Sequence, residues 1–204
     1  TKIKNKSLAG ADLSEASFAH SDLSGVNLAG TILHTTNFWK ANLSGQDFTV
    51  TDVITDGLVF IESNLSNSNF EGVNLSPKES YSQVFQNKAY LMSGATQTPE
   101  DEAMIKKDLF GDHHVLIISA EVRGNDLAVN YIFFNSFANA NLVNANFKNA
   151  SLARANFYSA DLTNADLSGA DLSWAFLFDA DLSNTNLEGA NLQGVILDNA
   201  ILSN

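Results

Sequence analysis

The stretch ADLTNADLSGADLSWAFLFDADL (160–182) has leucine at every fifth position and alanine two residues before each leucine. This period does not fit an α-helix, in which five steps turn a side chain by about 140°. It does not fit a straight strand either, because an odd spacing alternates between the two faces. It fits a chain that turns a corner every five residues, so that positions i and i−2 of each short side point to a common axis. The backbone groups then pair with the coils above and below, about 4.8 Å away.

The same period runs through most of the chain. Its outward positions are filled by Ser, Asn, Asp, Gly and Thr, which tolerate tight turns. The large apolar position i is occupied by Leu8, Leu13, Phe18, Leu23, Leu28, Leu33, Phe38, Leu43, Phe48 and Val53, then, after a two-residue slip in phase, by Phe60, Leu65, Phe70 and Leu75, and finally by Ile132, Phe137, Leu142, Phe147, Leu152, Phe157, Leu162, Leu167, Leu172, Leu177, Leu182, Leu187, Leu192, Leu197 and Leu202.

The segments ANLSG (41–45), ANFKN (145–149) and ADLSG (165–169) resemble the motif of the pentapeptide repeat family. That motif is a small residue, Asp or Asn, Leu or Phe, a small polar residue, and then any residue. The resemblance implies an all-β solenoid, a right-handed quadrilateral parallel β-helix with four pentapeptides per coil. Residues about 20 apart then stack in columns, so that Phe18 lies over Phe38 and Phe137 over Phe157. Roughly seven coils give a rod on the order of 35 Å long.

Residues 77–130 break the period and shift in composition. TPEDEAMIKKDLFG (98–111) is typical of a helix, with a Thr-Pro start, acids in the first turn and a final glycine. HHVLIISAEV (113–122) and LAVNYIFF (127–134) flank RGND and predict a β-hairpin, while SYSQVFQNKAYL (80–91) favours a further strand.

We therefore expect three parts: N-terminal coils at 1–76, a small α+β insertion at 77–130 packed against the side of the rod, and C-terminal coils at 131–204 that continue the solenoid. Insertions in repeat arrays often lie on a binding face. The insertion either recognises a partner or only shields apolar surface where the coil breaks, and the sequence leaves both open.

Composition narrows the function. The chain has 11 basic and 23 acidic residues, a net charge of −12, so direct binding of nucleic acid or an anionic membrane is not expected. It has no cysteine and no apolar run long enough to span a membrane. It also lacks G-x-S-x-G, Walker A and G-x-G-x-x-G motifs.

Two groups of residues are candidates for a catalytic or metal site. His113 and His114 are adjacent on a predicted strand, so their side chains point to opposite faces and do not hold one ion. Asp161, Asp166 and Asp171 lie on three successive sides of the coil, where hydrogen bonding at the corners is their expected role. We predict no enzyme activity, no catalytic or metal-binding residue and no cofactor.

Apolar side chains at outward positions mark a candidate partner surface. The stacking rule places Phe178 beside Tyr158 and Phe176 beside Ile196, with Trp174 next to them. A continuous apolar patch on a protein surface needs an explanation. Either the insertion covers it, the interpretation favoured here because the chain re-enters the rod nearby, or a partner does.

The ends of the rod are a second candidate surface, because a solenoid ends in an unpaired coil edge. The alternating lysines of TKIKNK (1–6) discourage the addition of a strand at the N-terminus. No capping helix follows at the other end, where we expect two copies to pair end to end as a homodimer. The candidate residues of this edge are Ile196, Leu197, Ile201 and Leu202.

The sequence therefore predicts a non-catalytic scaffold that binds another protein. The resemblance also implies an alternative, an acidic DNA mimic that binds DNA gyrase or topoisomerase IV, as some bacterial members do. The charge is −4 over 1–76, −3 over 77–130 and −5 over 131–204. The negative charge per length of rod is lower than that of duplex DNA, and the charges are spread around the rod. The DNA mimic is therefore the second hypothesis. We slightly favour the cytoplasm over the periplasm or thylakoid lumen, and expect any targeting segment to precede Thr1.

Overall fold

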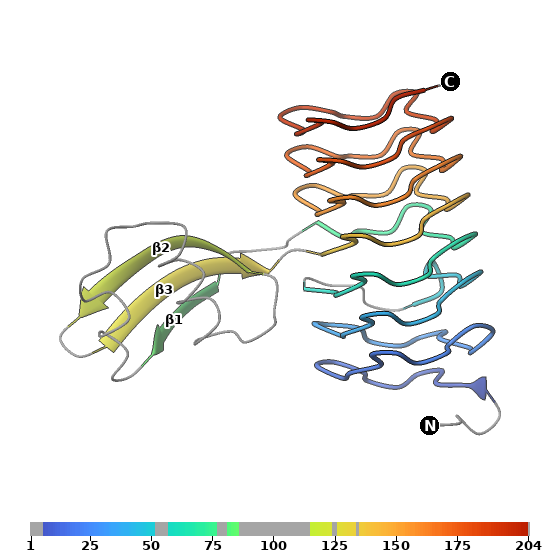
Figure 1. Cartoon of the computed structure of the whole chain (residues 1–204). Helices are drawn as coiled ribbons and strands as arrows, with labels where there is room; N and C mark the ends of the chain where they lie inside the picture. Colours follow the sequence, from blue (N-terminus) through green and yellow to red (C-terminus); the bar gives the residue numbers. More distant parts are fainter. Residues whose placement is uncertain are drawn as a thin grey trace.

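The computed structural model describes residues 6–51, 57–76 and 135–203, together with the backbone of three strands between 81 and 133. The repeats form a rod of stacked coils, with the N-terminus at one end and the C-terminus at the other (Figure 1). The strands lie to one side of this rod (Figure 1). The rod is the right-handed quadrilateral parallel β-helix that the family resemblance implies.

Parallel pairing between successive coils holds the rod together. Bridges join residues 20 apart, such as Ser17 to Asn37 and Asp161 to Asp181. Each coil is bonded on both sides: the amide of Leu162 donates to the carbonyl of Asp181 at 2.8 Å, and the amide of Asp161 donates to the carbonyl of Ala140 at 3.0 Å. The short sides of the coil thus satisfy their backbone groups without forming long strands.

The corners explain why Asn, Asp and Gly recur. The second residue of most corners has a positive φ, for example 58° at Asn164 and 68° at Gly169, and Asn and Gly adopt that conformation most easily. Where the residue before the core position is Asp or Asn, its side chain closes the turn: Asp161 Oδ1 accepts the amide of Thr163 at 3.0 Å. Local chemistry therefore sets a corner at every fifth residue.

The core is a column of leucine, phenylalanine and alanine side chains along the axis. Leu162, Leu167 and Leu172 are fully buried. The predicted stacking is confirmed, with ring centroids 5.7 Å apart for Phe18 and Phe38 and 4.8 Å apart for Phe137 and Phe157. Stacked rings at these distances add stabilisation to that of the buried area.

The coil continues across both interruptions. Bridges span 22 residues at the phase slip, from Asn37 to Val59, and 77 residues across the insertion, from Val59 to Ser136. The additional residues therefore leave and rejoin the rod without changing which residues stack. Asn135 stands at the return point, where its Oδ1 accepts the amide of Leu58 at 2.8 Å and its Nδ2 donates to the carbonyl of Leu75 at 2.6 Å.

The insertion contains a three-stranded antiparallel sheet of order β1-β3-β2. Its strands are β1 (Tyr81–Phe85), β2 (Val115–Arg123) and β3 (Asp126–Phe133). The register of β2 against β3 shifts between Ile117 and Ser119. The predicted hairpin is present as β2 and β3, and the further strand as β1.

One assignment at the end of the insertion is wrong. The five-residue period predicts Ile132 as the first core position of the returning repeat, but Ile132 lies in β3 opposite Leu116, and the coils resume at Asn135 and Ser136. Ile132 matches the five-residue period by coincidence, because a strand with alternating apolar residues can place one of them at the expected core position. The helix predicted over 98–111 lies outside the described residues.

Candidate functional site

One side of the rod differs from the other three. We call it the aromatic face; its inward residues are Phe18, Phe38, Phe60, Phe137, Phe157, Leu177 and Leu197. The outward residues that directly follow these inward residues form a column along the rod. All of them except the last are apolar. They are Ala19, Trp39, Ile61, Ala138, Tyr158, Phe178 and Asp198. The next side of the rod has mostly hydroxyl groups at this position, as at Ser44, Thr163 and Ser183.

The C-terminal half of this face carries the predicted partner surface, the aromatic patch, which comprises Tyr158, Trp174, Phe176, Phe178 and Ile196. The rings of Tyr158 and Phe178 stack with centroids 5.8 Å apart and planes 8° apart. Phe176 and Ile196 are bridged neighbours. The two pairs that the stacking rule predicted, Tyr158 with Phe178 and Phe176 with Ile196, are therefore neighbours in the structure.

The patch is open to solvent. Tyr158, Trp174 and Phe176 are 42%, 56% and 43% exposed, so the expectation that the insertion covers them is wrong. Phe178 is half-buried, because its ring packs on that of Tyr158. Trp174 lies over the corner of the next coil: a Cβ placed on Gly194 would be 2.6 Å from the indole ring. Only glycine at that corner leaves room for the tryptophan.

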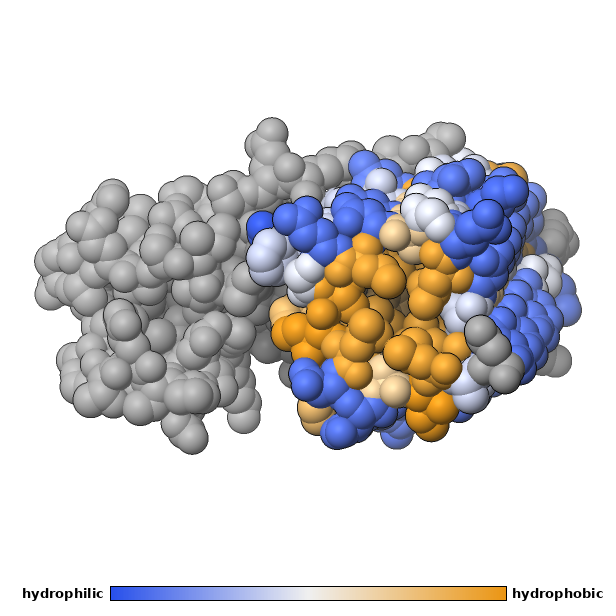
Figure 2. Space-filling view, turned by 90° about the horizontal axis from the view of Figure 1, so that it is seen from above, coloured by the Kyte–Doolittle hydropathy of each residue, from blue (hydrophilic) through white to orange (hydrophobic). Residues whose placement is uncertain are grey.

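The C-terminal edge of the rod is also apolar. Viewed end-on, the last coil presents a large hydrophobic surface (Figure 2). Ile201 and Leu202 are 51% and 58% exposed, Ile196 is exposed, and Leu197 is partly buried. Ile196 belongs to both surfaces, so the aromatic patch and the C-terminal edge are continuous.

The edge offers backbone groups as well as side chains. In the described structure, the amides of Leu192 and Leu197 and the carbonyls of Val195 and Ala200 have no bond to another coil. A shallow hollow of about 400 Å³ opens beside Leu202. Its lining residues are Leu182, Thr185, Asn186, Leu187, Glu188 and Leu202. An unpaired edge of this kind is a template for another chain.

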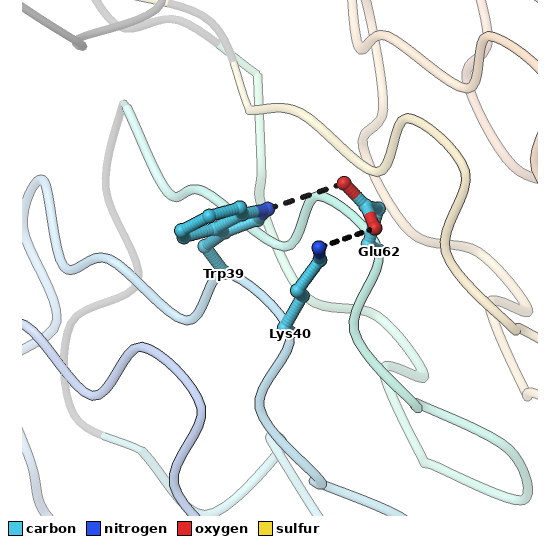
Figure 3. Close-up of polar contacts among 3 residues, drawn as sticks. All are labelled: Trp39, Lys40 and Glu62. Atoms are coloured by element: carbon cyan, nitrogen blue, oxygen red, sulfur yellow. Dashed lines mark hydrogen bonds and ion pairs between the residues drawn. The ribbon is translucent and has the colours of Figure 1, made fainter.

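The N-terminal half of the aromatic face has its own exposed aromatic residue, Trp39, held by a polar cluster (Figure 3). Its Nε1 donates to Glu62 at 3.3 Å, while Lys40 Nζ lies 3.1 Å from the same carboxylate and 4.8 Å from the indole centroid. Hydrogen bonds from Lys40 and Trp39 hold the pKa of Glu62 below its usual range. The ring of His20 meets the indole edge to face at 4.8 Å.

Sequence reasoning missed Trp39, although it lies in the same column as Tyr158. The phase slip and the insertion separate the two, so a uniform step of 20 residues does not connect them. Counting pentapeptides across the interruptions would have found the match. Between the two exposed parts of the face, Val59, Ser136 and Ala138 occupy outward positions but are buried, next to the point where the coils resume.

The aspartates that invited a search for a carboxylate pair have structural roles. Asp166 and Asp171 accept the amides of Ser168 and Ser173 at 2.9 and 3.0 Å. Hydrogen bonds from Ser168 hold the pKa of Asp166 below its usual range. No group of three metal-ligating side chains occurs among the residues with described positions. His113 and His114 lie outside these residues.

The geometry defines an extended solenoid with an exposed apolar patch. The family comparison agrees with the solenoid. The family model described as pentapeptide repeats matches residues 11–49, 136–169 and 165–204, in eight copies. The chain belongs to this family. A search of curated proteins finds no significant match. Within the part of the chain that is described, no helix has the length and apolar character of a membrane span.

Solved structures of the same family are similar to this chain. HetL from the cyanobacterium Nostoc sp. strain PCC 7120, a protein involved in heterocyst differentiation regulation, is 25% identical with a TM-score of 0.42; the match covers 96% of this chain but only 65% of HetL. Rfr23 from Cyanothece 51142 is 15% identical with a TM-score of 0.36, covering 96% and 90%. QnrB1, a plasmid-mediated fluoroquinolone resistance protein, is 18% identical with a TM-score of 0.33, covering 95% and 92%. With TM-scores below 0.5, none of these proteins assigns a function to this chain.

Proposed function

We propose that the protein is a non-catalytic scaffold that binds another protein through the aromatic patch. The exposure of Trp174, the largest side chain of the patch, carries this proposal. Large exposed aromatic groups gathered on one side of an otherwise polar surface are typical of interaction sites. Tryptophan and tyrosine are also the side chains that most often dominate binding energy at protein interfaces.

The rod suits this role because it holds the patch rigidly. Phe176 is bonded through its amide to the carbonyl of Ala155, and Phe157 through its amide to the carbonyl of Phe176. The backbone that carries the Phe176 side chain is thus held by coils on both sides. A preorganised surface loses less conformational freedom on binding.

A photo-crosslinking amino acid at position 176 tests the proposal in cells of the source organism. We expect a crosslinked species of discrete mass, absent when the same group replaces Val143, an outward residue on the next side of the rod. The double variant Tyr158→Ser and Phe176→Ser should abolish partner binding. It should change the free energy of unfolding by only about 1 kcal/mol or less. Identical crosslinks at 176 and 143, or a large loss of stability, would contradict the proposal. Inhibition of DNA gyrase supercoiling would instead support the DNA-mimic alternative.

We further propose that two copies pair through the C-terminal edge. Exposed Ile201 and Leu202 and the unpaired amides and carbonyls of the last coil support this pairing, since a two-fold partner supplies both donors and acceptors. One end of a rod is a small surface, so the dimer should be weak and depend on concentration. Sedimentation velocity should show a 44 kDa species, about twice the monomer of 22.0 kDa, that is lost in Leu202→Ser. A single monomeric species at millimolar concentration would exclude the dimer.

A further inference from the structure

We infer that the segment bound by the aromatic patch is a cationic amphipathic stretch of the partner protein. This inference rests on the proposed function and adds the chemistry of the partner. Two exposed carboxylates border the patch, those of Asp179 and Asp198. Asp198 continues the column of Tyr158 and Phe178, and Asp179 follows Phe178 at the corner.

The backbone places Asp179 and Asp198 next to the residues that carry the stacked rings. The amide of Asp179 donates to the carbonyl of Asp198 at 3.0 Å, and the amide of Ser159 donates to the carbonyl of Phe178 at 2.9 Å. Phe178 and Asp198 therefore stand on successive coils, about 4.8 Å apart. When an apolar side chain of the partner packs on the two stacked rings, a basic side chain of the partner that lies one coil further along the rod comes within reach of a carboxylate.

That spacing matches a common pattern in proteins. Side chains at i and i+4 of a helix lie about 5–6 Å apart, so a helix with adjacent apolar and basic residues presents both groups at the required separation. The exposed Trp174 indole adds an aromatic ring that attracts a cation as well as an apolar group.

The surrounding charge favours the same partner. Residues 131–204 contain seven acidic and two basic residues. One of the basic residues, Arg154, lies one coil before Trp174 and gives the region a less negative side. An acidic segment would be repelled by most of this region, whereas a basic one is attracted over a distance of about 8–10 Å at ordinary ionic strength.

Two synthetic helical peptides test the inference. They share the same leucine positions, and one carries lysine where the other carries glutamate. Binding is followed by the fluorescence of Trp174 in a Trp39→Phe background. We expect the lysine peptide to bind at least about tenfold more tightly than the glutamate peptide at 0.15 M salt. The double variant Asp179→Asn and Asp198→Asn should weaken the lysine peptide by about tenfold.

A matched control separates recognition from general attraction to an acidic protein. The double variant Asp47→Asn and Asp166→Asn also removes two negative charges, but from another side of the rod. It should weaken binding of the lysine peptide less than about twofold. Equal effects of the two double variants, equal binding of the two peptides, or the same fluorescence change with phosphatidylcholine vesicles would overturn the inference. If crosslinking at position 176 succeeds while the lysine peptide fails, the docking surface stands and only the cationic partner is rejected.

Discussion

Replacing Asn135 by alanine distinguishes what the five-residue repeat predicts from what the structure predicts. Asn135 precedes Phe137 by two residues, the position that alanine fills in the same column at Ala155 and Ala175. The repeat therefore predicts that alanine is harmless or better at 135. The structure predicts the opposite, because the Asn135 side chain bonds both ends of the coil that the insertion interrupts.

The size of the effect follows from the two bonds. Asn135 is fully buried, as are Leu58 and Leu75, whose amide and carbonyl it satisfies at 2.8 and 2.6 Å. A buried polar group that loses its partner costs about 1–3 kcal/mol, so Asn135→Ala should lower the free energy of unfolding by about 2–6 kcal/mol. That is a large part of the stability of a typical domain, about 5–15 kcal/mol.

Urea unfolding followed by circular dichroism measures this loss, with Asn141→Ala as the control. Asn141 is exposed and its Oδ1 accepts the amide of Val143 at 3.1 Å, so its replacement should cost only about 0.5–1.5 kcal/mol. Hydrogen exchange at the Leu58 amide should also accelerate more in Asn135→Ala than exchange at Leu162. A loss no greater than that of the control would refute the role of Asn135 in closing the interrupted coil.

Two further predictions concern the surface. Gly194→Ala should displace the Trp174 indole and change its fluorescence, because the new Cβ would lie 2.6 Å from the ring. The control Gly189→Ala has a similar φ of 70° but only a backbone atom 4.0 Å away, so it should leave the emission unchanged. Equal spectra for the two variants would contradict the packing of Trp174 against Gly194. Asp12 accepts the hydroxyl and the amide of Ser14 at 2.6 and 3.0 Å, and these bonds hold the pKa of Asp12 below its usual range. A lowered folded-state pKa stabilises the fold above the unfolded value of about 3.9, and this contribution is lost as the pH falls through and below it. Ser14→Ala should raise the pKa of Asp12 in a carboxyl NMR titration, and an unchanged value would exclude the hydroxyl as its cause.

The fold could be predicted because every link of it is local. Positions i and i−2, the corner with its positive φ and the Asx hydrogen bond all lie within five residues, as at Ala160, Asp161, Leu162 and Asn164. A period that repeats these links many times leaves one solution for the backbone. The columns of stacked phenylalanines follow from it without further information.

Prediction failed where the chain stops being local. Ile132 fits the period but pairs with Leu116 in β3, a contact that depends on a strand 16 residues away. Likewise, Trp39 joins the column of Tyr158 only because the coils stay in phase across the insertion. Such relations are set by which coil the chain rejoins, and no five-residue window contains that information.

The same regularity argues for where function lies. A repeat of this kind makes the four sides of the rod chemically equivalent, so no side is specified by the fold itself. The aromatic face departs from that equivalence in two exposed parts, at Trp39 and from Tyr158 to Phe178, and the coils resume between them at Ser136. The leucine and alanine side chains inside the rod are buried, whereas the rings of Trp39, Tyr158 and Trp174 on its outside stay exposed. Exposed aromatic side chains gathered on one side are typical of interaction sites, and this is why we propose the aromatic face, rather than the acidic corners, as the side that binds a partner.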